Sequence, residues 1–327
     1  MMTVPRRAMR EASHSGTRPP WSGRSADPER PIRLFSMDGG EPCGNPPCMP
    51  RIGVDGADLH YEDTGGPGEP VVFAHGLLWS TKLFRSQFEA LGGEYRCIAF
   101  DFRGQGKSQV TASGYDMDTL SRDAAQIIER LGAGPCHFVG LSMGGFVGMR
   151  LAARRPELLR SLSLLETAAD AEPLFNRPKY AAMAALSRVL GFGPFVPQVE
   201  RIMFGKSFLA DPARETMRRD LRAQLLGNDT TGTARAVGGV IWRKGVEDLL
   251  PGIDVPTLVL SGEEDVAVTP ARSRRTAEAI RGARFQTIPR AGHSSSLENP
   301  EAVTEALRGF FAEVGSRPPR AQVSRAS

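Results

Sequence analysis

The feature that most limits how this chain can fold is a series of short apolar runs separated by helical segments. The runs are continuously apolar rather than alternating, which is typical of parallel strands that helices cover on both faces. Strands that alternate with helices predict an α/β fold with a doubly wound sheet. The expected strands are 71–75, 96–101, 136–140, 161–166, 256–262 and 284–289, and the expected helices are 119–131, 144–154, 270–281 and 300–313.

The alternation stops between two of the expected strands. The intervening stretch is rich in helical patterns and contains several methionine and phenylalanine residues, so we expect it to be an insertion into the α/β core. The predicted core is therefore 49–166 and 244–314, with a helical insertion at 167–243.

The sequence changes character near residue 50. Before that point, prolines punctuate a mixture of serine, glycine and arginine without apolar periodicity, which cannot bury enough surface to fold. We therefore predict that residues 1–48 are disordered, and that the tail 315–327 is disordered as well. The sequence from Met49 onward has the apolar patterns of a folded domain, so we hypothesise that the native chain starts at Met49. A measured mass of the native protein that includes residues 1–48 would exclude this hypothesis.

The composition is that of an ordinary globular protein, with 40% hydrophobic and 24% charged residues among 327. The net charge of +4 is modest and the arginines are scattered among acidic residues, so we expect no nucleic-acid partner. No apolar run reaches the roughly 18 to 20 residues of a membrane helix, and no signal peptide is apparent. Four cysteines are too few for a disulfide framework at this length, and we expect a cytoplasmic protein.

One serine stands in the sequence Gly-Leu-Ser-Met-Gly, directly after an expected strand and before an expected helix. The glycines on either side of Ser142 permit a sharp turn that exposes its hydroxyl above the sheet. The same turn aims the N–H of Met143 at the place where negative charge would develop on a substrate carbonyl oxygen. Because this spacing often arises by chance, its position between a strand and a helix is what makes Ser142 the candidate nucleophile.

A serine nucleophile needs a base, and the chain has five histidines. His14 lies in the segment predicted to be disordered, and His60 and His137 lie in strand runs, where structural roles are expected. His293 follows the last expected strand in a glycine-containing loop, which places it at the carboxyl edge of the sheet beside the serine turn. We therefore predict that His293 is the base.

The base must be oriented by a carboxylate, and Asp265 follows a strand in the same way as His293. The resulting chain order of serine, aspartate and histidine is the one expected for a nucleophile on such a turn. Glu166 also ends a strand, and it remains an alternative to Asp265.

The turn at Ser142, His293 and Asp265, together with the five short segments quoted below, resemble the α/β-hydrolase superfamily over about residues 52–314. The resemblance implies a mostly parallel eight-stranded sheet flanked by helices, with the helical insertion as a cap over the active site. It also implies that Leu77 donates a second N–H to the oxyanion, alongside Met143. The likeness extends to 3-oxoadipate enol-lactonases and carboxylesterases. The matching segments are HGLLWS, DFRGQGKS, GLSMGG, GEEDVAVTP and AGHSSSLENPE.

Apolar side chains in and beside the insertion are candidates to line a substrate pocket. We name Trp79, Met183, Phe204 and Trp242 for this role. The alternative for each of them is simple packing between cap helices.

The predicted activity is hydrolysis of an ester or lactone of a small, largely apolar substrate through an acyl-enzyme intermediate. No metal or organic cofactor is required by this chemistry, and we expect none. A cofactor-free haloperoxidase or perhydrolase, or a C–C hydrolase, would use the same three residues. A non-catalytic binding protein with this fold is a further alternative.

Overall fold

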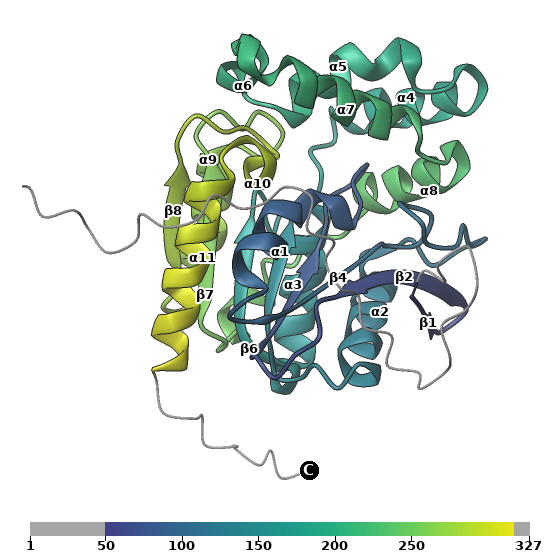
Figure 1. Ribbon diagram of the computed structural model, residues 1–327. Coiled ribbons are helices and arrows are strands. Elements are labelled where there is room, and N and C mark those ends of the chain that lie inside the picture. The colour runs from purple at the N-terminus through teal and green to yellow at the C-terminus, as the bar shows by residue number, and fades with distance from the viewer. Residues whose placement is uncertain (1–49, 317–327) are drawn as a thin grey trace, which may run out of the picture. The chain divides into compact units, whose positions relative to one another are not determined.

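The computed structural model describes residues 50–316. The predictions made for residues 1–48 and for most of the tail 315–327 lie outside this range. Gly315, predicted to be disordered, is instead the last residue of helix α11 Pro300–Gly315. Within residues 50–316, the chain forms an eight-stranded sheet with the strand order β1-β2-β4-β3-β5-β6-β7-β8 (Figure 1). The strands are β1 Arg51–Val54, β2 Ala57–Asp63, β3 Pro70–Ala74, β4 Arg96–Phe100, β5 Cys136–Leu141, β6 Leu159–Leu165, β7 Thr257–Gly262 and β8 Arg284–Ile288.

The six strands from β3 to β8 are parallel to one another, and β2 pairs antiparallel with both β1 and β4. This confirms the expected mostly parallel sheet. No bounds were predicted for the hairpin of β1 and β2, although His60 in β2 was placed in a strand run, because the residues of these two strands do not form a continuous apolar run. The Asp55-Gly56 turn was its sequence signal, since Gly56 adopts a φ of 70°.

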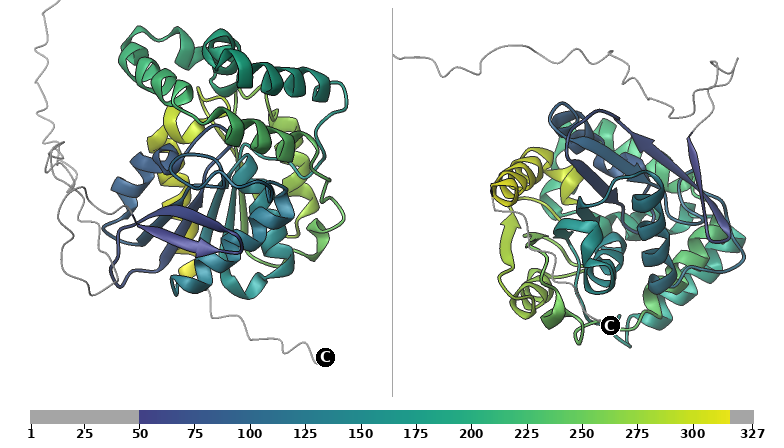
Figure 2. Two further views of the ribbon diagram at one scale, coloured as in Figure 1. Left: turned by 90° about the vertical axis from the view of Figure 1, so that its right-hand side faces the viewer. Right: turned by 90° about the horizontal axis from the view of Figure 1, so that it is seen from below.

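Helices cover both faces of the sheet, as the two views of Figure 2 show. Alternate residues of β3 enter different cores: Val72 and Ala74 pack in the cluster that includes α2, α3 and α9, whereas Val71 and Phe73 pack in the cluster with α1 and α11. The apolar run of β3 is continuous because both of its faces are buried. The helices that cover the sheet are α1 Arg85–Leu91, α2 Met117–Arg130, α3 Met143–Arg154, α9 Pro270–Ala279, α10 Ser295–Glu298 and α11 Pro300–Gly315.

The helix ends are set by local capping that periodicity alone does not show. Helix α2 begins two residues earlier than expected because the carboxylate of Asp116 accepts a hydrogen bond from the N–H of Thr119, at 2.9 Å. Helix α11 likewise begins where the side chain of Asn299 accepts from the N–H of Ala302.

Between β6 and β7 the chain forms a helical layer, seen beyond the ends of the strands at the top of Figure 1. We call this layer the cap. Its helices are α4 Arg177–Leu190, α5 Val196–Met203, α6 Lys206–Ala210, α7 Glu215–Leu226 and α8 Thr230–Ile241. None of the helices found in residues 50–316 is long and apolar enough to cross a lipid bilayer.

A buried ion pair ties the loop after β4 to helix α2. Arg103 donates from Nε and Nη2 to the two carboxylate oxygens of Asp123, at 2.6 and 2.7 Å. Both side chains are almost completely buried. Removing one partner would leave the other charge buried and unpaired, which is far more costly than losing an exposed pair.

We predict that Asp123→Ala lowers the free energy of unfolding by about 3 to 5 kcal/mol. The matched control is Asp254→Ala, which removes the partner of Arg281 from an ion pair whose side chains are 53% and 77% exposed. This control should change the free energy by less than about 1 kcal/mol. Urea unfolding measures both, and equal effects of the two substitutions would contradict the structural role given to Asp123.

Candidate active site

Ser142 lies in a strained turn between β5 and α3. Its φ of 51° and ψ of −107° are values that a residue with a side chain rarely adopts. Glycines make the turn possible, because a Cβ on Gly140 would overlap the carbonyl oxygen of Gly144, and a Cβ on Gly144 would overlap that of Ala74. Two backbones therefore approach each other closely beneath Ser142, and Ser142 lines a cavity.

His293 and Asp265 meet at the carboxyl edge of the sheet. Nδ1 of His293 donates to Oδ2 of Asp265 at 2.8 Å, and both side chains are buried. The other carboxylate oxygen, Oδ1, accepts from the N–H groups of Ala267 and Val268 at 2.8 and 3.0 Å. The pair fixes the imidazole tautomer, so that Nε2 is left as a proton acceptor. His293 lines the same cavity as Ser142.

Glu166, the alternative carboxylate, has a different environment. It is fully buried with a φ of 45°, and its Oε1 accepts from the N–H of Gly262 at 3.0 Å. Burial, followed by the nearby charge of Asp265, raises the pKa of Glu166 well above its usual range. A raised pKa favours the uncharged carboxylic acid, which stabilises an imidazolium less well than a carboxylate does, so Asp265 stays the predicted partner of His293.

Two N–H groups are candidates for an oxyanion hole. Met143 is the first residue of α3, where backbone N–H groups lack partners within the helix and the helix dipole is positive. Leu77, in the loop after β3, lines the cavity together with Ser142. Both residues are thus placed where the resemblance expects donors, and the donor role itself stays a prediction.

The loop that carries Leu77 is held by hydrogen bonds of its neighbours. His75 donates from Nδ1 to the carbonyl of Gly76 at 2.7 Å, and its Nε2 accepts from the N–H of Phe102 at 3.1 Å. Burial lowers the pKa of His75, so the neutral ring can donate and accept at once. The next residue, Leu78, donates its N–H to Oε1 of Gln105 at 2.8 Å.

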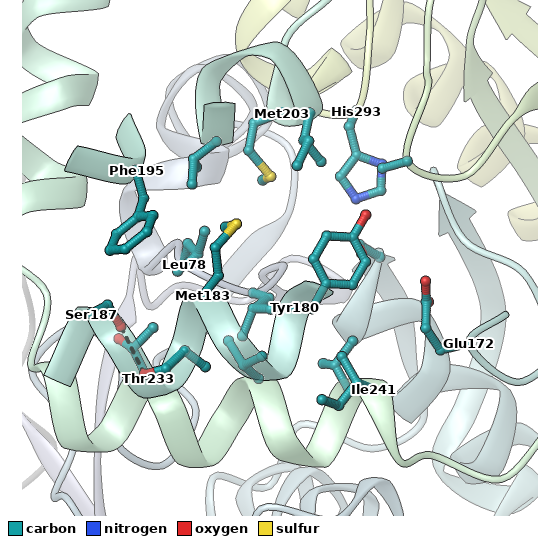
Figure 3. A pocket seen from close by; sticks show the side chains of 18 of the residues that line it. Leu78, Glu172, Tyr180, Met183, Ser187, Phe195, Met203, Thr233, Ile241 and His293 are labelled. Atoms are coloured by element: carbon teal, nitrogen blue, oxygen red, sulfur yellow. Dashed lines mark hydrogen bonds between the residues drawn. The ribbon is translucent and has the colours of Figure 1, made fainter. Parts of the chain in front are cut away.

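The cavity has a volume of about 140 Å³ and lies between the serine turn and the cap (Figure 3). Most of its lining side chains are apolar, and half of the lining residues come from α4, α5 and α8. Figure 3 shows His293, Tyr180 and Glu172 on one side of the view, with Phe195 and Ser187 on the opposite side. The lining residues are Leu77, Leu78, Ser142, Phe146, Glu172, Tyr180, Met183, Ala184, Ser187, Phe192, Phe195, Val199, Ile202, Met203, Thr233, Val237, Val240, Ile241, Arg243, Ala267, Val268 and His293.

Of the four side chains named from the sequence for this pocket, Met183 lines the cavity and the other three require correction. Trp79 is fully buried and packs edge-on against Phe204, with ring centroids 5.9 Å apart. Both rings belong to the core rather than to the cavity wall. Trp242 is 64% exposed, and the guanidinium of Arg177 lies over its ring.

Five polar lining residues were not predicted: Glu172, Tyr180, Ser187, Thr233 and Arg243. Burial and the nearby charge of Glu172 raise the pKa of Tyr180, which keeps the phenol protonated, and Figure 3 shows its hydroxyl pointing toward His293. The sequence of α4 contained a pattern that could have identified lining residues. The lining residues Tyr180, Met183, Ala184 and Ser187 follow the i, i+3, i+4, i+7 spacing of one helix face.

The remaining described histidines have structural contacts, as expected. Nδ1 of His137 lies 2.7 Å from the hydroxyl of Ser161, and its ring stacks on Phe311. His60 contacts the carbonyl of Pro50 through Nδ1. His14 lies outside the described residues.

Comparison with known proteins identifies the family to which this chain belongs. A family model described as the alpha/beta hydrolase fold matches residues 69–300, which is most of the described chain. The chain belongs to the alpha/beta hydrolase fold family. The eight-stranded sheet and its flanking helices are those of this family, as the sequence resemblance implied.

Similar family members have several named activities. A Mycobacterium tuberculosis protein, provisionally named a non-heme bromoperoxidase, is 32% identical over 79% of this chain and 98% of its own length. The structure of a thermophilic esterase from Thermogutta terrifontis is 30% identical with a TM-score of 0.75, and covers 81% of this chain and 97% of that one. An enol-lactonase from Burkholderia xenovorans LB400 is 29% identical with a TM-score of 0.75, over 80% of this chain and all of that one.

We predict that Glu166→Gln flattens the dependence of stability on pH in this hydrolase-fold protein. In the wild type the unfolded state releases the Glu166 proton above about pH 4.5 while the folded state retains it, so stability falls as pH rises toward the folded-state pKa. The variant Glu166→Gln does not lose stability in this way, because glutamine has no carboxyl proton to release. Its free energy of unfolding should therefore rise relative to the wild type by up to about 1.4 kcal/mol per pH unit.

Urea unfolding at pH 5, 6 and 7 measures this difference. Glu278→Gln, at an exposed glutamate of α9, is the control and should track the wild type at every pH. A constant difference between Glu166→Gln and the wild type across this range would show that Glu166 is ionised in the folded protein.

Proposed function

We propose that this protein is a serine hydrolase that cleaves a carboxylic ester or lactone of a small, largely apolar substrate through an acyl-enzyme intermediate. The observation that carries the proposal is the convergence of Ser142, on its strained turn, with the His293–Asp265 pair on one apolar cavity. The esterase and enol-lactonase names of similar family members support this reaction class. The expected cytoplasmic location stays a prediction from the sequence.

In the acylation half of the proposed reaction, Nε2 of His293 takes the proton from the Ser142 hydroxyl as Oγ attacks the ester carbonyl carbon. The carbonyl oxygen becomes an oxyanion, which accepts hydrogen bonds from the N–H groups of Leu77 and Met143. Asp265 holds the ring and stabilises the imidazolium. When the bond from carbon to the alcohol oxygen breaks, His293 gives its proton to the departing alkoxide.

In the deacylation half, water occupies the place of the alcohol. His293 removes one proton from it, and the hydroxide oxygen attacks the acyl carbon. The bond to Ser142 Oγ then breaks, the serine regains the proton from His293, and the carboxylic acid leaves. The protein ends in its starting state, so the cycle needs no co-reactant except water.

The cap supports a small substrate. Its helices α4, α5 and α8 enclose the cavity above Ser142, and the lining is mainly aliphatic and aromatic. Burying an apolar acyl group against such a lining is favourable in proportion to the area removed from water. An extended peptide would not fit a cavity of about 140 Å³.

A second candidate is perhydrolase or haloperoxidase chemistry at the same three residues, favoured by the bromoperoxidase name of the Mycobacterium tuberculosis relative. In that reaction, peroxide would take the place of water in the deacylation step. Assaying acetate with hydrogen peroxide beside simple esters separates the two activities.

A fluorophosphonate probe, which traps an activated serine without requiring a known substrate, should label Ser142. The probe should modify the wild type at this residue, as located by mass spectrometry. His293→Ala should slow the labelling by about 100- to 10,000-fold, the usual contribution of a general base.

The control for this labelling is Ser187→Ala. Ser187 lines the same cavity, but its hydroxyl donates to the carbonyl of Ala184 at 3.0 Å. The control should be labelled as fast as the wild type. A folded wild-type protein that takes up no probe at Ser142 would contradict the proposal and favour a binding protein.

A further inference from the structure

Glu172 and Arg243 place an ion pair in the wall of the otherwise apolar cavity. Nη1 of Arg243 lies 3.1 Å from Oε2 of Glu172, and the two side chains are only 2% and 11% exposed. The guanidinium also covers the ring of Phe146, with 4.0 Å between its central carbon and the ring centroid. Among the lining residues in the described part of the chain, Arg243 is the one permanent cation.

Both members of this pair make further hydrogen bonds. Arg243 donates to the carbonyl of Val240 at 2.9 Å and to that of Asp170 at 3.2 Å. The second carboxylate oxygen of Glu172 accepts from the side-chain amide of Asn176 at 2.9 Å. Arg243 therefore has three protein acceptors, the carboxylate of Glu172 and two carbonyl oxygens, and its charge is paired with that of Glu172.

The neighbouring charges also cancel. The carboxylate of Asp170 accepts from Nε and Nη2 of Arg272, at 3.0 and 2.9 Å. Asp170 and Glu172 thus compensate Arg243 and Arg272, two negative charges against two positive ones. An anion that entered the cavity would meet no uncompensated positive charge, and it would face the carboxylate of Glu172.

This inference rests on the proposed function. We propose that the enzyme selects uncharged esters or lactones with a short to medium apolar acyl group. It excludes acyl groups that carry a carboxylate, because Glu172 neutralises Arg243 in the cavity wall. A carboxylate would lose its hydration without gaining a cationic partner. An alkyl chain would lose only unfavourable contact with water. A cavity near 150 Å³ holds a group of about benzene size, which sets the scale of the acyl chain.

Three p-nitrophenyl esters of matched length test this selectivity on the wild-type protein. They are p-nitrophenyl hexanoate, p-nitrophenyl hydrogen adipate, which ends in a carboxylate, and methyl p-nitrophenyl adipate, which has the same chain without the charge. At pH 7.5 we expect kcat/KM for the hexanoate to exceed that for the hydrogen adipate by at least about 100-fold. The methyl ester should lie within about 10-fold of the hexanoate, because it differs in size but not in charge.

The variant Glu172→Gln removes the compensating charge while keeping the shape of the side chain. Arg243 would then attract the carboxylate of the hydrogen adipate, and the hexanoate-to-adipate ratio should fall by about 10-fold or more. Asp254→Asn changes the same charge at an exposed pair with Arg281. This control should leave the ratio unchanged, which separates a local effect from one of net charge.

The outcomes are distinguishable. Equal kcat/KM values for the hexanoate and the hydrogen adipate in the wild type would overturn the inference while leaving ester hydrolysis intact. An unchanged ratio in folded Glu172→Gln would overturn the role given to Glu172. Failure of all three esters, together with no probe on Ser142, would overturn the proposed function itself.

Discussion

The close approach of two backbones beneath Ser142 is the constraint on which the rest of the site depends. Helix α3 starts directly above the end of β3, and only glycine at position 144 leaves room for the carbonyl of Ala74. The chain between β5 and α3 must then turn within one residue, which forces the positive φ of Ser142. Such a conformation costs about 1 to 3 kcal/mol, and the buried strands and helix on either side hold it. The same turn leaves the first N–H of α3, that of Met143, beside the serine.

The loops at the carboxyl edge of the sheet bring further groups to this turn. Asp265 and His293 follow β7 and β8, two strands that are neighbours in the sheet, and their hydrogen bond fixes the imidazole. Glu166 follows β6 at the same edge, but its complete burial raises its pKa well above the usual range. These three groups thus lie at one edge of the sheet in different surroundings, which support different roles under the proposed function. The cap adds a neutral, apolar wall in which the ion pair of Glu172 and Arg243 is the main polar feature.

Local sequence patterns predicted the parallel strands and the turn at Ser142, because both depend on residues that are close in the chain. They also indicated Asp265 and His293, since parallel topology brings the ends of successive strands to one edge. The pocket lining was predicted poorly. Which apolar side chain faces a cavity depends on packing between segments that are distant in the chain. Trp79, in the loop after β3, lies in the core, and Trp242, at the end of α8, is exposed. The raised pKa of Glu166 results from long-range burial, which composition and spacing do not encode.

The most direct test of covalent catalysis at Ser142 is rapid quenching of the protein in acid during turnover of p-nitrophenyl hexanoate, followed by peptide mass spectrometry. The account predicts a hexanoyl group on the peptide that contains Ser142, formed within the first turnover and lost as substrate is exhausted. Continued release of p-nitrophenol with no acylated peptide, or with the acyl group on another residue, would contradict it.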